Sequence, residues 1–267
     1  MIVWNLSPIA FSLGGKIDVY WYGIIYALSV MISWKISCSI IRRAEIQINI
    51  PDFDKFMLVG IVACIIGARL GHIVFFDLNY YLQNPHEIFM LRNGGLSFHG
   101  GILGLIGTII WFSRQYKIGF KIIADILSFA GSIGIFLGRI ANFINQELYG
   151  KITSVDWAVI FSMVDNMPRH PTQLYEALFE GALSFVVMRA YWSFHGMRNT
   201  EKYIGSGKYS FIFLSIYSSS RYFIEFFKEV EPVESLSNVL FITTGQLLSV
   251  LLFIFALLVI VLPRKKR

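Results

Sequence analysis

The stretch KIIADILSFAGSIGIFLGRIANFINQELYG, residues 121–150, joins a long apolar run to an abrupt polar ending. Residues 121–142 are almost continuously apolar, and a helix needs about 20 such residues to cross the hydrocarbon core of a bilayer. The polar ending begins inside the run, with Arg139 and Asn142, and continues to Glu147. We therefore predict a membrane-spanning helix that carries a polar cluster at one end.

The composition of the whole chain favours the same class of protein. Of its 267 residues, 55% are hydrophobic and 15% are charged, whereas soluble domains carry about 25% charged residues. The mean hydropathy is +0.61. The net charge of +6 lies mainly in the loops between apolar runs, so it does not indicate a nucleic-acid-binding surface. The composition predicts an integral membrane protein.

The chain holds about seven apolar runs that are long enough to cross a bilayer as helices. They are continuous and longer than the strands of a membrane β-barrel, which favours an all-α fold. We expect a single polytopic membrane domain over residues 1–267, with a small cap or short strands in the loop at about residues 143–171, between the fourth and fifth helices. The expected spans are roughly residues 17–41, 55–77, 95–113, 121–142, 172–194, 208–227 and 242–263.

The loops between these runs differ in basic charge. One set contains fourteen lysine and arginine residues, in residues 42–55, 114–121, 189–208 and 264–267, and the opposite set contains five. Basic loops stay on the cytoplasmic side of a membrane. The N-terminus is therefore expected outside and the C-terminus inside.

Three of the expected helices contain two glycines four positions apart. The pairs are Gly67/Gly71, Gly100/Gly104 and Gly134/Gly138. Small residues at this spacing allow two helix backbones to approach closely. We predict tight helix packing at all three pairs.

Polar residues within the apolar runs gather at one depth once this orientation is imposed. Ionisable side chains inside a membrane are costly, so each is a candidate for function. Lys35 and Asp125 lie near inner ends, where a side chain can extend to water, and we expect no site there. The residues expected near the outer side are Tyr20, Tyr22, Arg69, His72, His99, Arg139, Asn142, Glu176, Arg221 and Glu225. They predict one shared site in the outer leaflet.

Three of these residues are arginines, Arg69, Arg139 and Arg221, and we expect them to compete for a short supply of carboxylates within the membrane. The planar guanidinium matches phosphate oxygens well, so we predict that they bind a phospholipid head group. Two alternatives stay open: Arg221 pairs with Glu225 four positions on, or Arg69 is held by Asp77, another carboxylate or a carbonyl.

His99 lies between two glycine pairs in GGLSFHGG, residues 94–101. The glycines leave the ring uncovered, and histidine suits proton transfer near neutral pH. We predict a role for His99 as a base, the alternative being a hydrogen-bonded core residue. The histidines do not have the spacing of metal ligands, and we expect neither a metal nor a cofactor.

Four segments occur in the order in which they occur in one family. They are GGLSFHGG, GRIANFINQELYG, HPTQLYEALFEG and RYFIEFFKE. The chain resembles the bacterial prolipoprotein diacylglyceryl transferases over essentially its whole length. The resemblance implies a seven-helix inner-membrane fold with a periplasmic cap. It also implies transfer of the diacylglyceryl group of phosphatidylglycerol to the lipobox cysteine of a preprolipoprotein signal peptide, with release of glycerol phosphate.

The resemblance also implies roles for individual residues. Arg139 and Arg221 would act at the phosphate, and His99 is the histidine often proposed as the base. The resemblance further implies that Tyr22 and Glu147 are catalytic and that Asn142, Gly150 and Glu225 bind the lipid. We add Arg69 to the lipid-binding residues because its guanidinium suits a phosphate. Tyr20 departs from the family, because many members carry histidine there, so any role of that histidine is absent from this chain.

The sequence leaves several alternatives open. Tyr22, Glu147 or water are alternative bases. A transporter or flippase with an anionic-lipid site is the alternative function, although no inverted repeat is seen. A purely structural subunit explains the packing glycines but not the gathered polar residues. The preferred preprolipoproteins and acyl chains, the oligomeric state and the routes of substrate entry stay open.

Overall fold

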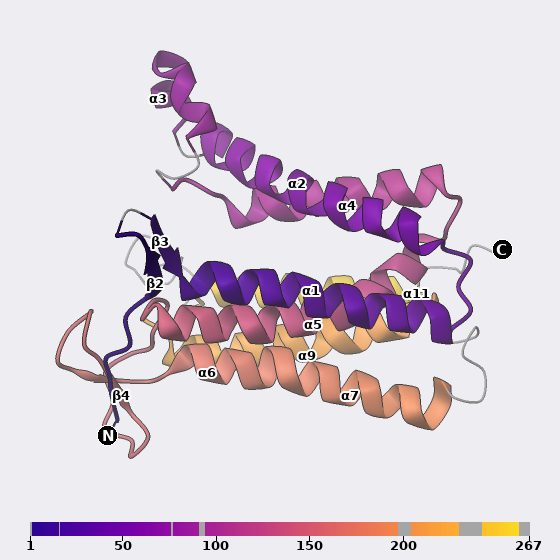
Figure 1. The fold of residues 1–267 in the computed structure, drawn as a ribbon. Coiled ribbons are helices and arrows are strands. Elements are labelled where there is room, and N and C mark those ends of the chain that lie inside the picture. The colour runs from indigo at the N-terminus through magenta and orange to yellow at the C-terminus, as the bar shows by residue number, and fades with distance from the viewer. Residues whose placement is uncertain are drawn as a thin grey trace. The chain divides into compact units, whose positions relative to one another are not determined.

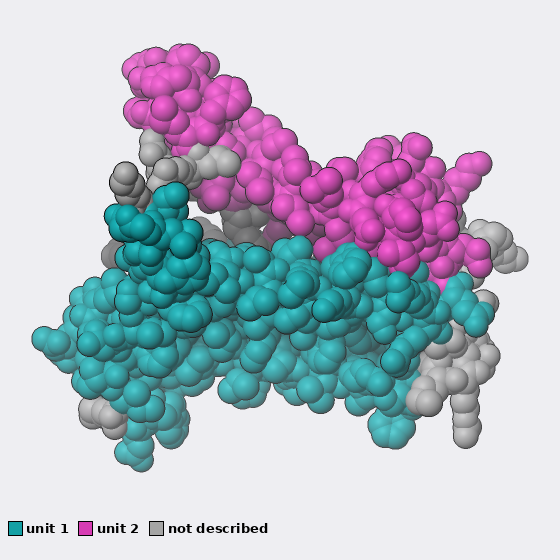
Figure 2. Space-filling model, viewed as in Figure 1, with its two compact units in different colours: residues 1–45, 124–266 teal, residues 46–123, 267 magenta. Residues whose placement is uncertain are grey.

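The structure is a computed structural model, and it is mainly helical (Figure 1). It describes residues 2–15, 17–75, 77–90, 94–196, 204–229 and 242–261. The chain forms two compact units (Figure 2). The larger unit comprises Met1–Glu45 and Ala124–Lys266, and the smaller unit comprises Ile46–Ile123.

The larger unit is a group of long helices. Helix α9 packs against α6, α7 and α11, and the Ser33 hydroxyl of α1 donates to the Ala130 carbonyl of α5 over 3.0 Å. The helices are α1 (Trp21–Arg43), α5 (Phe120–Ile144), α6 (Thr172–Glu176), α7 (Leu183–Tyr191), α9 (Lys208–Ile224) and α11 (Thr244–Val261). Between them lie the π-helical segments η3 (Ala177–Ala182) and η4 (Trp192–Gly196) and the 3-10 turn η5 (Glu225–Phe227).

Two small sheets accompany these helices in the larger unit. Strand β1 (Ile2–Trp4) runs parallel to β4 (Val159–Phe161), which pairs with β5 (Pro168–Arg169). The short strands expected in residues 143–171 are thus present. Strands β2 (Ile9–Leu13) and β3 (Ile17–Tyr20) form a hairpin.

The first span begins later than expected, because the strand β3 precedes it. Residues 17–20 were expected in a helix, but α1 begins at Trp21. The sequence Ile17-Asp18-Val19-Tyr20 alternates in polarity, as a strand does, and the Ser12 hydroxyl on β2 donates to Asp18 over 2.6 Å. The expected start of the first span at residue 17 is therefore wrong by four residues.

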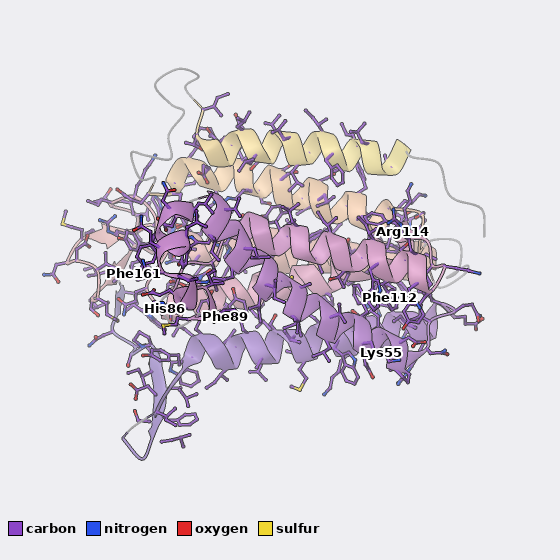
Figure 3. All side chains as sticks on the ribbon, turned by 90° about the horizontal axis from the view of Figure 1, so that it is seen from above. Lys55, His86, Phe89, Phe112, Arg114 and Phe161 are labelled. Atoms are coloured by element: carbon purple, nitrogen blue, oxygen red, sulfur yellow. The ribbon has the colours of Figure 1, made fainter. Side chains whose placement is uncertain are left out.

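The smaller unit is an antiparallel pair of long helices. It contains α2 (Ile50–Phe75), α3 (Leu78–Gln83), the 3-10 turn η1 (Pro85–Phe89) and α4 (Phe98–Gln115). Figure 3 shows Lys55, Phe112 and Arg114 at one end of this unit and His86 and Phe89 at the other. The ends of α2 and α4 that carry Lys55 and Arg114 therefore lie together, in agreement with the orientation expected from the loop charges.

Glycines decide how closely α2 and α4 approach. A Cβ on Gly71 would lie 2.8 Å from the Cα of Gly100, so a larger residue would force the helices apart. The tight packing predicted for Gly67/Gly71 and Gly100/Gly104 is confirmed. It is wrong for Gly134/Gly138, where added Cβ atoms would meet only Ser29 and Tyr26 at the ordinary distances of 3.8 and 3.6 Å.

Three of the described helices are long and apolar enough to cross a membrane: residues 21–43, 50–74 and 120–144. Residues 245–258 form a shorter apolar helix. Large apolar side chains such as Ile66 and Leu251 are more than half exposed, which suits contact with lipid chains rather than water. The structure therefore supports a multi-pass membrane protein.

Asp125 was expected to extend to water at the inner end of its helix, and this expectation is wrong. Its side chain does not reach water, because it is fully buried. It accepts hydrogen bonds from the backbone N–H groups of Gly205, Gly207 and Ser210, at 2.8 to 3.0 Å, and from the Ser210 hydroxyl at 2.8 Å. These four donors offset the cost of burying the carboxylate and fix the start of α9. Lys35, by contrast, is exposed.

Candidate functional site

Six charged side chains of the larger unit form an arginine–carboxylate cluster. Glu176 and Glu180 are fully buried within it, whereas the side chains of Arg139 and Arg221 keep 19% and 18% of their area exposed. The cluster consists of Arg139 from α5, Glu176 from α6, Glu180 from η3, Arg221 from α9, Glu225 from η5 and Lys228, which follows η5. The cluster therefore has a buried acidic floor and partly accessible guanidinium groups.

Glu176 is the hub of this cluster. Its Oε2 lies 3.2 Å from Arg139 Nε, and its Oε1 accepts a hydrogen bond from Arg221 Nη1. The Lys228 ammonium donates to the same Oε1 over 3.4 Å. Burial lowers the pKa of that ammonium, and Glu176 opposes this effect. One carboxylate thus holds three cations in a fixed arrangement.

Arg221 has further partners. Its Nη2 lies 3.3 Å from Glu225 Oε2, so the pair that their spacing of four left open as an alternative is present in the structure. Its Nη1 also lies 3.9 Å from Glu180 Oε1. Arg139 Nη2 approaches Glu180 Oε2 at 3.6 Å. Arg139 and Arg221 are therefore linked through shared carboxylates rather than standing apart.

Glu180 was not among the residues predicted from the sequence, and the premise that carboxylates are scarce is wrong. The cluster contains three cations and three carboxylates, so it is balanced when all six are ionised. The signal was present in YEALFEG, because Glu180 follows Glu176 by four positions and such residues are neighbours on a helix surface. Gly181 allows η3 to press against α5, since a Cβ there would lie 2.7 Å from the Phe136 backbone.

A second polar group brings together Tyr22, Asn142 and Glu147. The Asn142 amide donates to Glu147 Oε1 over 2.6 Å. The Tyr22 hydroxyl donates to Tyr26 over 3.0 Å, and it lies within electrostatic range of Asn142 and Glu147. Arg139 precedes Asn142 by three positions on α5, so the two groups share a helix face.

Buried polar residues of α6 hold the loop that carries Glu147. The Gln173 amide donates to the Glu147 carbonyl over 2.6 Å, and the Thr172 hydroxyl donates to the Leu148 carbonyl over 3.0 Å. Gln146 and Leu148 have positive φ angles of 57°, a conformation that costs energy for residues with side chains. Thr172 and Gln173 were not predicted as site residues, because nothing in the local sequence shows which loop their side chains bond.

Gly150 has a packing role in the structure. Its N–H donates to the His170 carbonyl over 2.9 Å. A Cβ at this position would lie 2.6 Å from the Phe227 carbonyl oxygen and 2.7 Å from His170 Cβ. The absent side chain therefore lets the Glu147 loop join the segment that carries Lys228.

Arg169 ties this junction together from the cap. It bonds Asp165 at 2.7 Å, Glu229 at 3.1 Å and the Gly150 carbonyl at 3.2 Å. Its hydrogen bond lowers the pKa of the Asp165 carboxyl. The Arg169 side chain thus connects the cap to the Glu147 loop.

Arg69, in the smaller unit, is surrounded by backbone carbonyls. Its guanidinium donates to Ile88 at 2.9 Å and to Gly94 at 2.6 Å, and also to Glu87, Gly95 and Met90. The carbonyl alternative raised by the sequence is therefore the one that the contacts favour. Phosphate binding by Arg69 remains an untested prediction.

His99 is the second residue of α4, after the helix cap formed by Ser97. Its side chain lies outside the described part of the structure, so its role as a base stays a prediction. Tyr20 ends β3 directly before α1, with half of its surface exposed. His72 of the smaller unit lies 3.1 Å from the Asp77 carboxylate.

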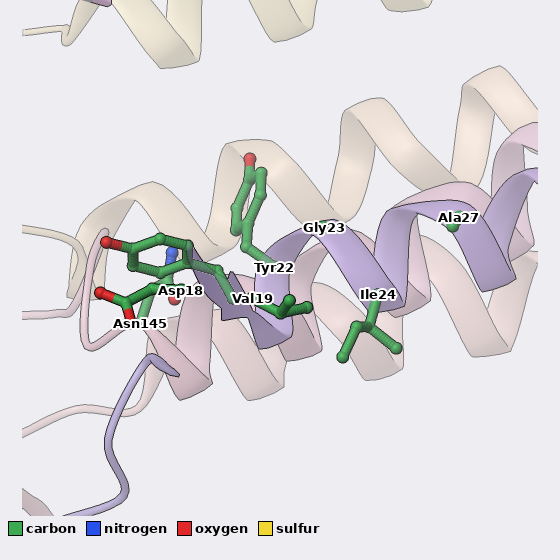
Figure 4. A pocket seen from close by; sticks show the side chains of 8 residues that line it. Asp18, Val19, Tyr22, Gly23, Ile24, Ala27 and Asn145 are labelled. Atoms are coloured by element: carbon green, nitrogen blue, oxygen red, sulfur yellow. The ribbon is translucent and has the colours of Figure 1, made fainter. Parts of the chain in front are cut away.

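A groove of about 720 Å³ runs along the start of α1 (Figure 4). Val19, Ile24 and Ala27 give it an apolar wall, and Tyr22 and Asn145 add polar groups. It combines an apolar surface with polar groups of the Tyr22 region, as a site for an amphipathic molecule requires.

Comparisons with known proteins agree with the resemblance found in the sequence. The family model described as prolipoprotein diacylglyceryl transferase matches residues 8–262. The chain is 41% identical over 247 residues to the phosphatidylglycerol–prolipoprotein diacylglyceryl transferase of Rickettsia felis, covering 92% of both chains. It is 36% identical over 263 residues to the enzyme of that name from Geobacter sulfurreducens, covering 98% of this chain and 97% of the relative. The chain therefore belongs to the prolipoprotein diacylglyceryl transferase family of membrane enzymes.

Proposed function

We propose that this transferase moves the diacylglyceryl group of phosphatidylglycerol to the lipobox cysteine of a preprolipoprotein signal peptide. The products are a thioether-linked lipid and glycerol phosphate. Family membership supports the activity. The single structural observation that carries the proposal is the pair Arg139 and Arg221, partly exposed on a buried acidic floor.

The proposal includes the placement of the chain in the bacterial inner membrane. About seven spans cross it, with the N-terminus and the cap on the periplasmic side and the C-terminus in the cytoplasm. The loop charges support this orientation. The arginine–carboxylate cluster then lies near the outer leaflet, where a phospholipid presents its phosphate.

The two arginines would bind that phosphate as a clamp. Guanidinium groups form charge-assisted hydrogen bonds with phosphate oxygens. As the carbon–oxygen bond breaks, charge builds on the departing phosphate, and fixed donors stabilise it. Glu176 supports this role by holding both guanidinium groups from behind.

The nucleophile comes from the second substrate. The thiolate is the reactive form of cysteine. Its sulfur forms a bond to the glycerol carbon while the carbon–oxygen bond to phosphate breaks, and the oxygen keeps the electron pair. By family resemblance His99 takes the thiol proton. Tyr22, Asn142, Glu147 and Glu225 would position the glycerol and phosphate of the lipid head group, and Gly150 would hold their loop.

A reconstitution tests the proposal. The purified chain is placed in liposomes that contain phosphatidylglycerol and a lipobox peptide, and the peptide mass and free glycerol phosphate are followed together. We expect a diacylglyceryl gain in mass that matches the glycerol phosphate released. A serine-for-cysteine peptide is the control. Lipid movement between leaflets without peptide modification would instead support a flippase.

A further inference from the structure

Glu180 differs from the other two carboxylates of the arginine–carboxylate cluster. It is fully buried, and within the described chain neither of its oxygens forms a hydrogen bond. Its ion pairs with Arg139 and Arg221 are long, at 3.6 and 3.9 Å. Glu176 accepts hydrogen bonds from Arg221 and Lys228, and Glu225 accepts one from Thr243. Protonation of Glu180 would therefore disrupt fewer hydrogen bonds in the cluster than protonation of Glu176 or Glu225.

The charge of the cluster makes this difference important. Three cations and three carboxylates are already balanced before any lipid enters. A phosphodiester would bring one additional negative charge into a region of low dielectric, where an uncompensated charge is costly. A proton taken up together with the lipid removes that cost.

We infer that Glu180 is a positioning residue of this site, which takes up one proton as the lipid phosphate binds and so releases Arg139 and Arg221 to the phosphate oxygens. The inference rests on the proposed function, because it names the same phosphate site. The proton comes from solvent on binding and returns to solvent after glycerol phosphate leaves. Glu176, which contacts both guanidinium groups, keeps the two arginines in place.

The neighbours of Glu180 explain why the phosphate would change its proton occupancy. The groups that act on it electrostatically are Glu176, Arg139, Arg221, Lys228 and Tyr217. In the free site burial and the neighbouring Glu176 disfavour the ionised carboxylate, and the three cations favour it. A bound phosphate shares the arginines and adds a second negative neighbour. Both effects favour the protonated carboxyl.

The first experiment measures proton uptake by the unaltered protein. Short-chain phosphatidylglycerol is titrated calorimetrically into the full chain in a non-ionic detergent, without peptide, in two buffers of different ionisation enthalpy. We expect about one proton taken up per lipid at a pH where Glu180 is ionised, and an affinity that falls about tenfold per pH unit above its titration. Uptake of no proton between pH 5 and 9 would overturn the inference without any mutant.

The variant Glu180→Gln identifies the group. It keeps the shape of the side chain and carries no charge, so we expect tighter lipid binding at pH 8 and less than about a twofold change across the pH range. Asp156→Asn, at an exposed carboxylate of the cap, should keep the dependence of the unaltered chain. An unchanged pH dependence in Glu180→Gln would assign the proton to another group and overturn the inference.

The reconstitution with a lipobox peptide separates this inference from the proposed function. A chain that modifies the peptide but binds lipid without a proton retains the function and refutes the role of Glu180. A chain that binds lipid with one proton and never modifies the peptide retains the role of Glu180 as a lipid-site residue and refutes the transferase activity.

Discussion

Arg69, Arg139 and Arg221 were all predicted to bind the lipid phosphate, but the surroundings of Arg69 differ from those of the other two. Arg69 donates to five backbone carbonyls of its own unit. Arg139 and Arg221 contact side-chain carboxylates, some of them at long distances. Backbone carbonyls cannot move away without refolding a loop, whereas a side-chain ion pair can be exchanged. An intramembrane arginine is therefore a better ligand-site candidate when its partners are exchangeable.

The largest effect is expected from Arg139→Ala. Removing one preorganised donor costs about 2.7–4 kcal/mol of transition-state stabilisation, or roughly 100–1,000-fold in turnover. Turnover per folded molecule in liposomes is the measurement, and thermal unfolding in detergent is the control for folding. Near-normal turnover in this variant would remove the phosphate clamp from the mechanism.

His99→Gln tests the smaller unit for a catalytic contribution. A base contributes roughly 100-fold or more when the thiol is mostly protonated, so we expect a loss of about that size at pH 6.5. At pH 8.5 or above, about half of a free thiol is already ionised, and most of the activity should return. Equal losses at both pH values would instead indicate a positioning role.

Arg69→Ala is expected to act on stability rather than turnover. The variant leaves several carbonyls without a donor, and each unsatisfied buried group costs about 1–3 kcal/mol. We expect a lower unfolding temperature and, per folded molecule, turnover within about threefold of the unaltered chain. A loss as large as that of Arg139→Ala in well-folded protein would place Arg69 at the lipid and contradict the comparison.

Gly150→Ala probes the junction between the Glu147 loop and Lys228. A methyl group here meets the Phe227 carbonyl at 2.6 Å, and overpacking of this kind typically costs about 1–3 kcal/mol. Because the strain falls on the Glu147 loop, we expect turnover per folded molecule to fall, in addition to any loss of folded protein. Gly107→Ala is the matched control, since a Cβ there meets no atom within 4 Å.

The smallest effect concerns Asp165 of the cap. Arg169 holds the pKa of this carboxyl below its usual range, so the pair stabilises the fold above the unfolded pKa of about 3.9 and loses that contribution as pH falls through the folded value. The carboxyl is near the surface, so less than about 1 kcal/mol is expected. Asp165→Asn should lower the unfolding temperature at pH 7 by more than at pH 3. An equal change at both pH values would exclude the ion pair as its cause.

Much of the fold was predictable from the sequence, because each membrane-spanning helix needs a long run of apolar residues and such a run is visible in the sequence. A helix lies in every apolar run that was expected, and two glycine pairs pack as predicted. The hairpin over residues 9–20 and the turns of α3 and η1 were missed. Those segments are short, and their pairing depends on neighbours rather than on a long apolar pattern.

The site was predictable in its types of residue and not in its partners. The sequence by itself determined that arginines, asparagines and carboxylates end several apolar helices, since ionisable residues stand out in an apolar run. Only the tertiary structure decided that Asp125 caps α9, that Arg69 serves a loop, and that Glu176 and Glu180 lie under Arg139 and Arg221. The reason is physical: the free energy of a buried charge is set by the groups that surround it in space, and here those groups come from helices far apart in the chain.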